Sequence, residues 1–397
     1  MAERFRPASR TQADGIGEVL RAIVGPAHVR TATETDSAGG VAPLVIVEPE
    51  DERQVASVLR CANQAGLAVI PRGGGTKLAW GNPPKTADVV VSLGRLNRVV
   101  EHAWADLTVT VEAGCSIAQL QRTLAEHGQR LAVDPLWPEQ ATVGGILATN
   151  DSGALRLAFG ALRDLIIGVT LVLADGTIAR SGGKVVKNVA GYDLPKLATG
   201  SLGTLGVITR AVFRVHSLPR NSRTLTIAAA DAADMQRIIL AILGARLAVT
   251  AVQVRSGNEV DILLEGTNDG IAAQEAAIKE MGTVREGSPA VWKAREELWG
   301  DAPIVKFTTL PSRISTVSAA FSRFVIQATG IGYARAEGDL GELRAAMERD
   351  GGSLMILSKT KLDAWGNAGD AVPLMRAVKA QFDPNNTLNP GRFAGGI

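Results

Sequence analysis

Hydrophobic and polar positions in the first part of the chain follow the pattern of strands joined by helices. Residues 44–47 and 67–70 form short apolar runs, and between them apolar residues recur at helical spacing over 55–62. The acidic residues at 48–51 fit the first turn of this helix, where its dipole favours negative charge. From residue 41 onward the pattern therefore predicts a βαβ unit.

The same pattern continues to about residue 215, with hairpins in place of parallel units. Ser116 precedes an apolar helical face over 117–125 and is expected to cap that helix. Asp175-Gly176 is a typical hairpin turn. The strand-like segments are 88–93, 99–101, 107–111, 165–173, 176–179 and 207–215.

The second half mixes strands and helices differently and predicts a separate α+β unit over 216–365. Strands are expected at 225–229, 261–264, 304–308 and 354–357, and helices at 235–247, 271–281 and 290–299. Trp292 and Trp299, on the charged helix 290–299, are expected to be exposed or at an interface. Before this, residues 1–40 hold one helix, 16–24, and a polar link. After it, residues 366–397 are expected to return to the first unit through a helix with a buried face, formed by Val372, Met375, Val378 and Phe382.

A glycine-rich turn, Pro71-Arg72-Gly73-Gly74-Gly75-Thr76-Lys77, follows the strand 67–70 directly. Consecutive glycines allow positive φ and a close approach of the backbone to a ligand. Successive N–H groups in such a turn form a concavity that binds anions. The turn therefore indicates a diphosphate cradle, and from this stretch alone a flexible surface loop is an equal alternative.

Two more glycine turns follow, at 141–153 and 199–206. In the first of these, Gly144-Gly145 permits close approach, while Thr142, Asn150 and Ser152 offer neutral hydrogen-bonding groups. This set indicates a surface for a polar, uncharged ring system or a ribityl chain, with a purely structural helix start as the alternative. Neither an acid–base pair nor metal-ligand spacing is present in it.

Composition narrows the range of functions. The 397 residues carry a formal net charge of only +2 and 4% aromatic residues, which argues against nucleic-acid binding. Two cysteines, Cys61 and Cys115, stand far apart, so neither an internal iron–sulfur cluster nor a disulfide framework is expected. The first residues lack an apolar signal-peptide core, and no apolar run reaches about 18 residues. These features predict a reducing, intracellular protein that contacts a membrane only peripherally or through partners.

The three glycine turns together resemble, in order and spacing, the FAD-binding domain of the vanillyl-alcohol oxidase / p-cresol methylhydroxylase superfamily. The stretch Phe382–Arg392 is similar to the DP…NPG tail of its 2-hydroxyacid dehydrogenase branch. Within that branch, Ser181–Asp193 is typical of the second flavin subunits of bacterial glycolate oxidase complexes. The resemblance is strong over 41–215 and the last thirty or so residues, and thin over 216–365.

This resemblance implies an α+β fold: residues 1–40 as a helix and link, a two-subdomain FAD-binding domain of the p-cresol methylhydroxylase (PCMH) type at 41–215, a smaller α+β cap at 216–365, and 366–397 returning to the FAD domain. It implies FAD as the cofactor, and noncovalent attachment because no histidine matches an attachment motif. The implied FAD-binding residues are Pro71, Arg72, Gly73, Gly74, Gly75, Thr76 and Lys77 at the diphosphate; Pro135, Thr142, Val143, Gly144, Gly145, Asn150 and Gly153 at or near the flavin; and Gly206 and Ile208 at the adenine or ribose side.

The chain also departs from the family pattern. Self-sufficient members of the 2-hydroxyacid branch usually carry an HGDGN-type histidine motif, which is missing here. The histidines are His28, His102, His127 and His216, and each is expected to be a surface residue rather than a catalyst. The common Gly-Ser-Glu-Gly has Leu202 in place of glutamate. The sequence therefore identifies no catalytic base and no metal site.

In the family, the cap supplies substrate-binding residues. By chemistry alone, Lys306, Arg313, Tyr333 and Arg335 could pair with a substrate carboxylate, although ordinary solvated side chains are the favoured alternative.

The resemblance implies an FAD-binding subunit of a glycolate-oxidase-type complex that oxidises glycolate or a similar small 2-hydroxy acid to the 2-oxo acid. A second FAD subunit would carry the main catalytic site, and an iron–sulfur subunit would take the electrons onward. The expected location is the cytoplasm, with peripheral contact to the inner membrane through partners. The alternatives are a self-sufficient FAD-dependent 2-hydroxyacid dehydrogenase and a structural subunit with a vestigial flavin site.

Overall fold

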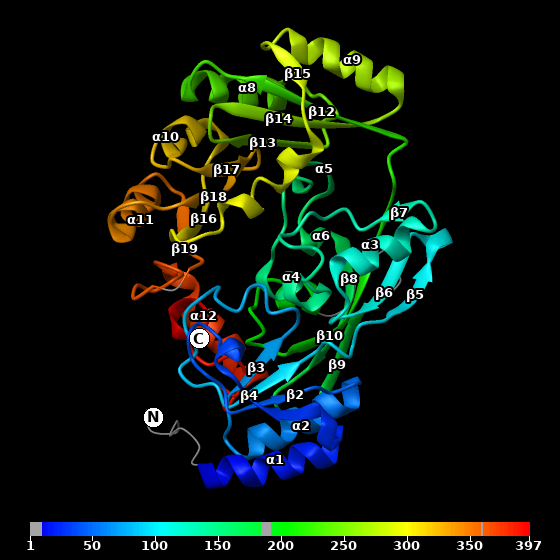
Figure 1. The fold of residues 1–397 in the computed structure, drawn as a ribbon, viewed down its shortest axis with the longest axis vertical. Coiled ribbons are helices and arrows are strands. Elements are labelled where there is room, and N and C mark those ends of the chain that lie inside the picture. Colours follow the sequence, from blue (N-terminus) through cyan, green and yellow to red (C-terminus); the bar gives the residue numbers. More distant parts are fainter. Residues whose placement is uncertain (1–9, 184–191, 359) are drawn as a thin grey trace.

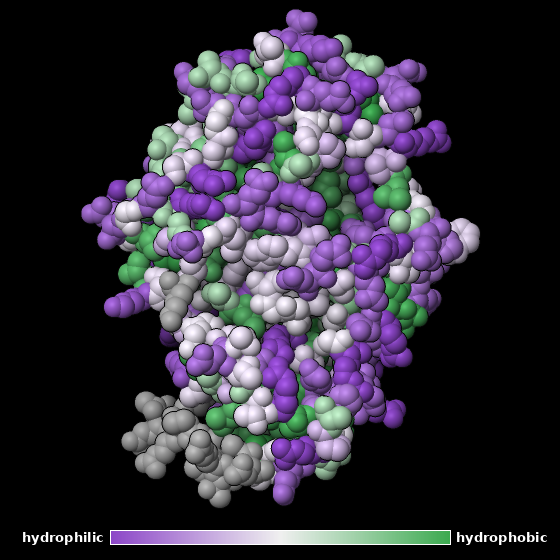
Figure 2. Space-filling view, viewed as in Figure 1, coloured by the Kyte–Doolittle hydropathy of each residue, from purple (hydrophilic) through white to green (hydrophobic). Residues whose placement is uncertain are grey.

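The computed structural model describes residues 10–183, 192–358 and 360–397. The middle of the family-typical stretch 181–193 therefore lies outside the described residues. The molecule is elongated, with one half formed by the N-terminal part of the chain and the C-terminal helix, and the other by residues from about 220 to 356 (Figure 1). On the face shown in Figure 2, the surface is mostly polar, with apolar residues visible only as scattered patches.

The first sheet is small and mainly parallel, with the order β1-β2-β4-β3. Strands β2, β4 and β3 run parallel, and β1 pairs antiparallel with β2. Asp51 caps α2 by accepting a hydrogen bond from the Gln54 backbone. The acidic residues 48–51 therefore precede the helix, and are not in its first turn as predicted. The elements are α1 (Arg10–Val24), β1 (Val29–Thr31), β2 (Val45–Val47), α2 (Glu52–Gln64), β3 (Val69–Arg72) and β4 (Val89–Ser92).

The second sheet is antiparallel and has the order β5-β6-β10-β8-β9. Both predicted hairpins are confirmed, and Ser116 caps α3 through the Gln119 N–H. The elements are β5 (Val99–Ala103), β6 (Thr108–Glu112), α3 (Ile117–Ala125), β7 (Gln129–Arg130), α4 (Val143–Thr149), α5 (Arg156–Phe159), α6 (Leu162–Leu165), β8 (Ile166–Val172), β9 (Ile178–Gly182), α7 (Leu194–Ala198), β10 (Val207–Arg214) and β11 (His216–Ser217). The two sheets share one continuous core of aliphatic side chains.

The cap contains an eight-stranded antiparallel sheet of order β15-β12-β14-β13-β17-β18-β16-β19. Its helices bury their apolar side chains in a core separate from that of the first two sheets. The elements are β12 (Asn221–Ala228), α8 (Ala232–Gly244), β13 (Ala251–Arg255), β14 (Glu259–Gly266), α9 (Asn268–Lys279), β15 (Val284–Glu286), β16 (Ile304–Thr308), α10 (Ile314–Ser318), β17 (Phe324–Gln327), β18 (Ile331–Arg335), α11 (Leu340–Arg349) and β19 (Ser353–Ile356).

The predicted helix 290–299 is wrong. The segment forms two short 3-10 turns, η4 (Pro289–Lys293) and η5 (Glu296–Leu298). Its two tryptophans are tied to different partners, since the Trp292 indole donates to Thr224 and the Trp299 ring packs 4.7 Å from that of Trp137. These tertiary contacts outweigh the local preference for a helix.

The C-terminal helix α12 (Val372–Phe382) leads into a segment that runs beside β3. The Val69 N–H donates to Thr387 (2.8 Å), and the Asn389 N–H donates back to Val69 (2.9 Å). The prediction that α12 has a fully buried apolar face needs correction, because Val372, Met375, Val378 and Phe382 are only half-buried. Its buried residue is Lys379, whose ammonium pairs with Asp383 at 2.6 Å. Among the helices of the described ranges, none has the length and apolar character needed to cross a membrane.

Candidate cofactor site

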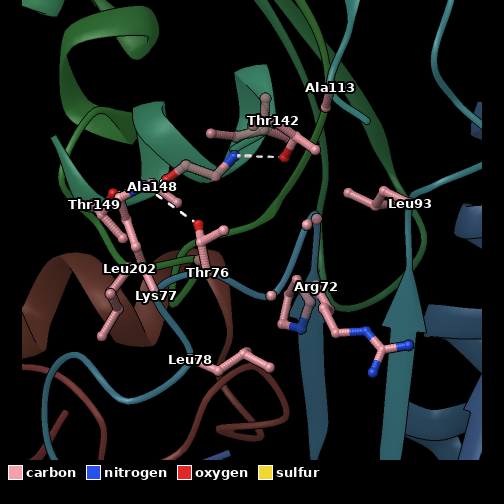
Figure 3. A pocket seen from close by; sticks show the side chains of 18 of the residues that line it. Arg72, Thr76, Lys77, Leu78, Leu93, Ala113, Thr142, Ala148, Thr149 and Leu202 are labelled. Atoms are coloured by element: carbon pink, nitrogen blue, oxygen red, sulfur yellow. Dashed lines mark hydrogen bonds between the residues drawn. The ribbon is translucent and has the colours of Figure 1, made fainter. Parts of the chain in front are cut away.

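A cavity of roughly 700 Å³, counted with its open mouth, lies where the first and second sheets meet. All three glycine turns and the C-terminal segment contribute to its wall. In Figure 3, Leu93 and Ala113 line one end and Thr149 and Leu202 the other, with Thr76 between them. The lining residues are Pro71–Leu78, Leu93, Ala113, Thr142, Gly144, Gly145, Ala148, Thr149, Leu202, Gly203, Gly206, Ile208, Asn389 and Arg392.

The first glycine turn is packed directly against the second. A Cβ on Gly73 would stand 2.0 Å from the Thr142 hydroxyl, and one on Gly74 would stand 1.8 Å from the Gln140 carbonyl oxygen. Gly75 has φ +76°. Only glycine satisfies these positions, so the turn is held close to α4 and is not a free surface loop.

The backbone donors of this turn are available to a ligand. Within the described residues, the N–H groups of Gly73, Gly74, Gly75 and Thr76 donate no hydrogen bond. These four residues are half-buried or exposed, and adjacent unpaired donors in a turn favour an anion. The turn therefore has the geometry of a diphosphate cradle.

The second glycine turn forms the start of α4. The Thr142 hydroxyl accepts from the Gly145 N–H at 3.3 Å, as Figure 3 shows, and the Thr149 hydroxyl donates to the Gly145 carbonyl at 2.8 Å. A Cβ on Gly144 would come within 2.8 Å of Ala113. The helix ends at Asn150, which has φ 48° and a buried side-chain oxygen without a hydrogen-bond partner. This wall is neutral and polar.

The C-terminal segment contributes two residues that the sequence analysis did not assign. Asn389 donates to the Leu202 carbonyl at 2.6 Å and so joins this segment to the third glycine turn. Arg392 donates to the Leu78 and Trp80 carbonyls at 2.6 and 2.9 Å, and its Nε is buried without a partner. The sequence signal that could have identified these two residues is the motif Asn389-Pro390-Gly391-Arg392, which resembles the C-terminal tail of the family.

Arg392 differs from the other buried cations. Lys77 and Arg295 pair with Asp151, and Lys379 pairs with Asp383. In the described part of the chain, Arg392 pairs with no carboxylate, and burial alone lowers its pKa to about 10. A buried charge without a counter-ion is costly, so Arg392 indicates that an anionic ligand belongs in the cavity. Together with the unpaired donors at 73–76, it makes the cavity fit FAD, whose diphosphate is anionic.

The cavity brings together most, but not all, of the residues assigned to FAD from the sequence. Val143 faces the core, and Pro135 and Gly153 do not line the cavity. Asn150 is also outside this cavity and lines the one that adjoins it. Gly153 instead donates its N–H to Asp134 at 3.0 Å. Arg72 contributes its backbone, since its guanidinium turns away from Thr142 and binds Asp36 at 2.7 Å (Figure 3).

A second cavity adjoins the first and shares Ala148, Thr149 and Leu202 with it. It lies between the FAD half and strands β16 and β19 of the cap, and encloses roughly 800 Å³ with its open mouth. Its remaining lining is Trp80, Asn150, Gly200, Lys306, Phe307, Thr308, Ser353, Leu354, Met355, Trp365 and Phe393.

A cluster of charged and aromatic side chains lies beside both cavities. Lys77 and Arg295 pair with the fully buried Asp151 at 3.2 and 3.1 Å. Burial opposes the charge of Asp151, yet Lys77 and Arg295 hold its pKa below the usual value. Lys306 stands 5.7 Å from the Tyr333 ring centre and forms no ion pair among the described residues. The Arg295 guanidinium lies 5.0 Å from the Tyr333 ring centre, and the two groups interact electrostatically.

The other candidates named from sequence have different surroundings. Arg335 donates to the carbonyls of Leu298, Glu297 and Trp299, so it supports the η5 turn. Arg313 is exposed and lines neither cavity. The histidines His28, His102, His127 and His216 are likewise outside both linings, and none is buried.

The Asp134 carboxyl predicts a pH dependence of stability. Burial raises its pKa to about 6, although Arg295 and the Gly153 and Leu155 N–H groups favour its charge. The folded protein thus holds this proton more tightly than the unfolded chain, whose value is 3.8. The resulting stability is present below pH ~4 and is lost as pH rises through ~6, by at most about 3 kcal/mol. Thermal unfolding of Asp134→Asn should lack this loss, while variant Asp301→Asn, at an exposed position, should keep it.

Comparison with known proteins agrees with this geometry. Residues 43–182 match the family model for an FAD binding domain, and residues 361–393 match that for the C-terminal domain of FAD linked oxidases. The chain is 34% identical over 183 residues to the glycolate oxidase subunit GlcD of Bacillus subtilis, which covers 46% of this chain and 39% of GlcD. It is 25% identical to a D-2-hydroxyglutarate dehydrogenase of Xanthomonas citri, over 88% of this chain and 89% of that protein.

The fold is shared with a solved structure of p-cresol methylhydroxylase with substrate bound. The TM-score is 0.76 at 16% identity, over 97% of each chain. The two-sheet half with the glycine turns thus carries an FAD binding domain and shares its fold with p-cresol methylhydroxylase, and the cofactor is FAD. The match to GlcD spans about two fifths of that relative's length.

Proposed function

We propose that this chain, which carries an FAD binding domain and the C-terminal segment of FAD linked oxidases, is a flavin-binding subunit in the oxidation of glycolate or a similar small 2-hydroxy acid. The similarity to GlcD and to a D-2-hydroxyglutarate dehydrogenase supports an oxidoreductase acting on this class of substrate. When bound, FAD supplies the capacity to accept a hydride. The chain's own residues bind and orient the reactants.

The observation that carries the proposal is the open anion position at Lys306. Its ammonium lines the second cavity, lies near the rings of Trp80 and Tyr333, and has no anion among the described residues. Asn150 lines the same cavity with a buried carbonyl oxygen that lacks a donor. A 2-hydroxy acid offers both missing groups: a carboxylate for Lys306 and a hydroxyl donor for Asn150.

Within the described ranges, the second cavity lacks a side chain that could accept the proton of the substrate hydroxyl. The residues that line the second cavity include no histidine, aspartate or glutamate. This supports a division of labour in which a sister flavin subunit carries out the primary oxidation and an iron–sulfur subunit receives the electrons. The two cysteines of this chain are unpaired, and Cys115 is buried. We place such a complex in the cytoplasm, attached to the inner membrane only through partners.

The decisive experiment uses the purified chain loaded with FAD. Glycolate or D-lactate should leave its flavin absorbance unchanged when the chain is alone, and should bleach it when the partner subunits are present. Bleaching of the isolated chain would instead establish a self-sufficient dehydrogenase. Failure of the apo chain to take up FAD at all would favour the vestigial structural subunit, which the unpaired donors at 73–76 and Arg392 argue against.

Replacing Lys306 with methionine tests the carboxylate position. The variant keeps an unbranched apolar stem and loses the ammonium group, so binding of a 2-hydroxy acid should weaken about 10- to 50-fold. Perturbation of the flavin absorbance of the FAD-loaded chain measures this binding, and FAD content should change little. Lys293→Met, at an exposed cap position, is the matched control and should behave as the parent chain.

A further inference from the structure

Lys77, Arg295 and Asp151 form a buried cluster between the FAD domain and the cap, and the half-buried Lys306 lies beside it. Asp151 is fully buried, and both of its oxygens are used. Oδ1 accepts from Arg295 at 3.1 Å, while Oδ2 accepts from the Leu136 N–H at 2.9 Å and pairs with Lys77 at 3.2 Å. Lys306 forms no ion pair among the described residues, although its charge also acts on Asp151.

The cluster is compact, so these charges act on one another. The Trp80 ring lies 5.7 Å from the Lys77 ammonium and 5.9 Å from that of Lys306. The Tyr333 ring lies 5.0 Å from the Arg295 guanidinium and 5.7 Å from the Lys306 ammonium. Lys77 and Arg295 belong to different halves of the molecule, and Asp151 joins them.

We propose that Asp151 is a built-in carboxylate that occupies the anion position between Lys77 and Arg295 and thereby makes the site selective for monocarboxylic 2-hydroxy acids. Among the described residues of this cluster, Lys306 is then the open anion position. The inference rests on the proposed function and concerns the same site. The relatives show why the distinction matters, because GlcD is named for glycolate, with one carboxylate, and the Xanthomonas enzyme for 2-hydroxyglutarate, with two.

The physical reason is the cost of a second buried negative charge. Asp151 lines neither cavity, but its charge interacts with that of Lys306, and its two ion-pair partners are already taken. A dicarboxylate that binds Lys306 through one end would therefore hold its second carboxylate in the field of Asp151. That second carboxylate would lose its hydration without gaining a counter-ion. Repulsion of this kind is an established way to exclude a competing ligand. Removing the Asp151 charge frees Lys77 and Arg295 for a carboxylate supplied by the ligand.

The test compares FAD-loaded chains titrated with carboxylates that cannot be oxidised: propionate with one carboxylate, and succinate and glutarate with two. Flavin absorbance and tryptophan fluorescence report binding, since Trp80 lies in the cluster. The parent chain should bind propionate at least 10-fold more tightly than either dicarboxylate. Asp151→Ala should reverse this preference by at least 10-fold, and Asp151→Asn, which preserves the volume and the Leu136 hydrogen bond, should shift it in the same direction.

Asp383→Asn is the matched control. It also removes a buried carboxylate that pairs with a lysine, but the Lys379–Asp383 pair lies on α12 and lines neither cavity. It should lower the unfolding temperature without any gain in dicarboxylate binding. FAD content and unfolding temperature are measured for every variant, and Asp151→Asn serves if Asp151→Ala does not fold.

The outcomes separate this inference from the proposed function. If the parent chain binds propionate and both folded Asp151 variants keep its preference, the role of Asp151 is refuted and the proposed substrate class stands. A parent chain that binds succinate as tightly as propionate also refutes it. If the parent chain holds FAD but binds none of the three carboxylates, the proposed function and this inference fall together.

Discussion

Replacing Gly74 with alanine should abolish retention of FAD during purification. The added methyl group would stand 1.8 Å from the Gln140 carbonyl oxygen, which is backbone and cannot move away as a side chain could. The first turn must then shift away from α4, which disperses the N–H groups of 73–76. Overpacking of this kind costs about 1–3 kcal/mol in stability, and the loss of the diphosphate hydrogen bonds adds to it in the complex.

The measurement is the ratio of flavin to protein absorbance in the purified chain, together with FAD affinity by fluorescence titration. Gly244→Ala is the control, because a Cβ there meets nothing within 4 Å. We expect the Gly74 variant to bind FAD at least 100-fold more weakly and the Gly244 variant to bind it normally. A yellow Gly74→Ala protein with unchanged affinity would show that the first turn is not the diphosphate site.

Replacing Arg392 with glutamine should weaken FAD binding by about 30-fold to several thousand-fold. Truncating one partner of a buried, hydrogen-bonded charge pair typically costs 2–5 kcal/mol, and the anionic cofactor is the partner that the described residues do not provide. The apo protein carries the guanidinium without a carboxylate, so its unfolding temperature should change much less than its FAD affinity. Arg392→Lys keeps the charge and should restore part of the affinity.

Arg376→Gln is the matched comparison, because Arg376 is exposed and donates only to the Gly395 carbonyl of the same C-terminal region. It should leave FAD affinity unchanged. Equal FAD affinity in the glutamine, lysine and parent forms of residue 392 would mean that its role is confined to holding the Leu78 and Trp80 carbonyls.

Local sequence patterns were sufficient to predict the strands and turns of the FAD domain, because each of these elements depends on neighbouring residues. The strand before the first glycine turn, the Asp51 and Ser116 caps and the Asp175-Gly176 hairpin all depend on residues within a few positions of one another. The glycine turns could likewise be recognised from the sequence, because a residue with a Cβ at Gly73 or Gly74 would clash and glycine is therefore required there.

Buried charges could not be recognised in this way. Arg295 appears in the sequence as one charge in a polar, helix-like segment, and its partner Asp151 lies 144 positions earlier. Lys379 lies on the same face of α12 as the predicted apolar residues, and it can be buried there because Asp383 and two carbonyl groups neutralise and solvate it. Arg392 and Asn389 of the cofactor site were missed for the same reason, because only the fold shows which groups these polar side chains contact.

The exchange of hydrogen bonds between Val69 and the segment 387–389 has a consequence for biogenesis. The cavity needs both the first glycine turn and residues more than 300 positions later in the chain. During synthesis, the FAD domain can assemble its sheets early, but a nascent chain without residues 387–392 lacks one wall of the pocket. FAD can therefore bind only after residues 387–392 have been synthesised. If translation stalls within the cap, the edge of β3 that pairs with this segment stays exposed and must be protected by chaperones.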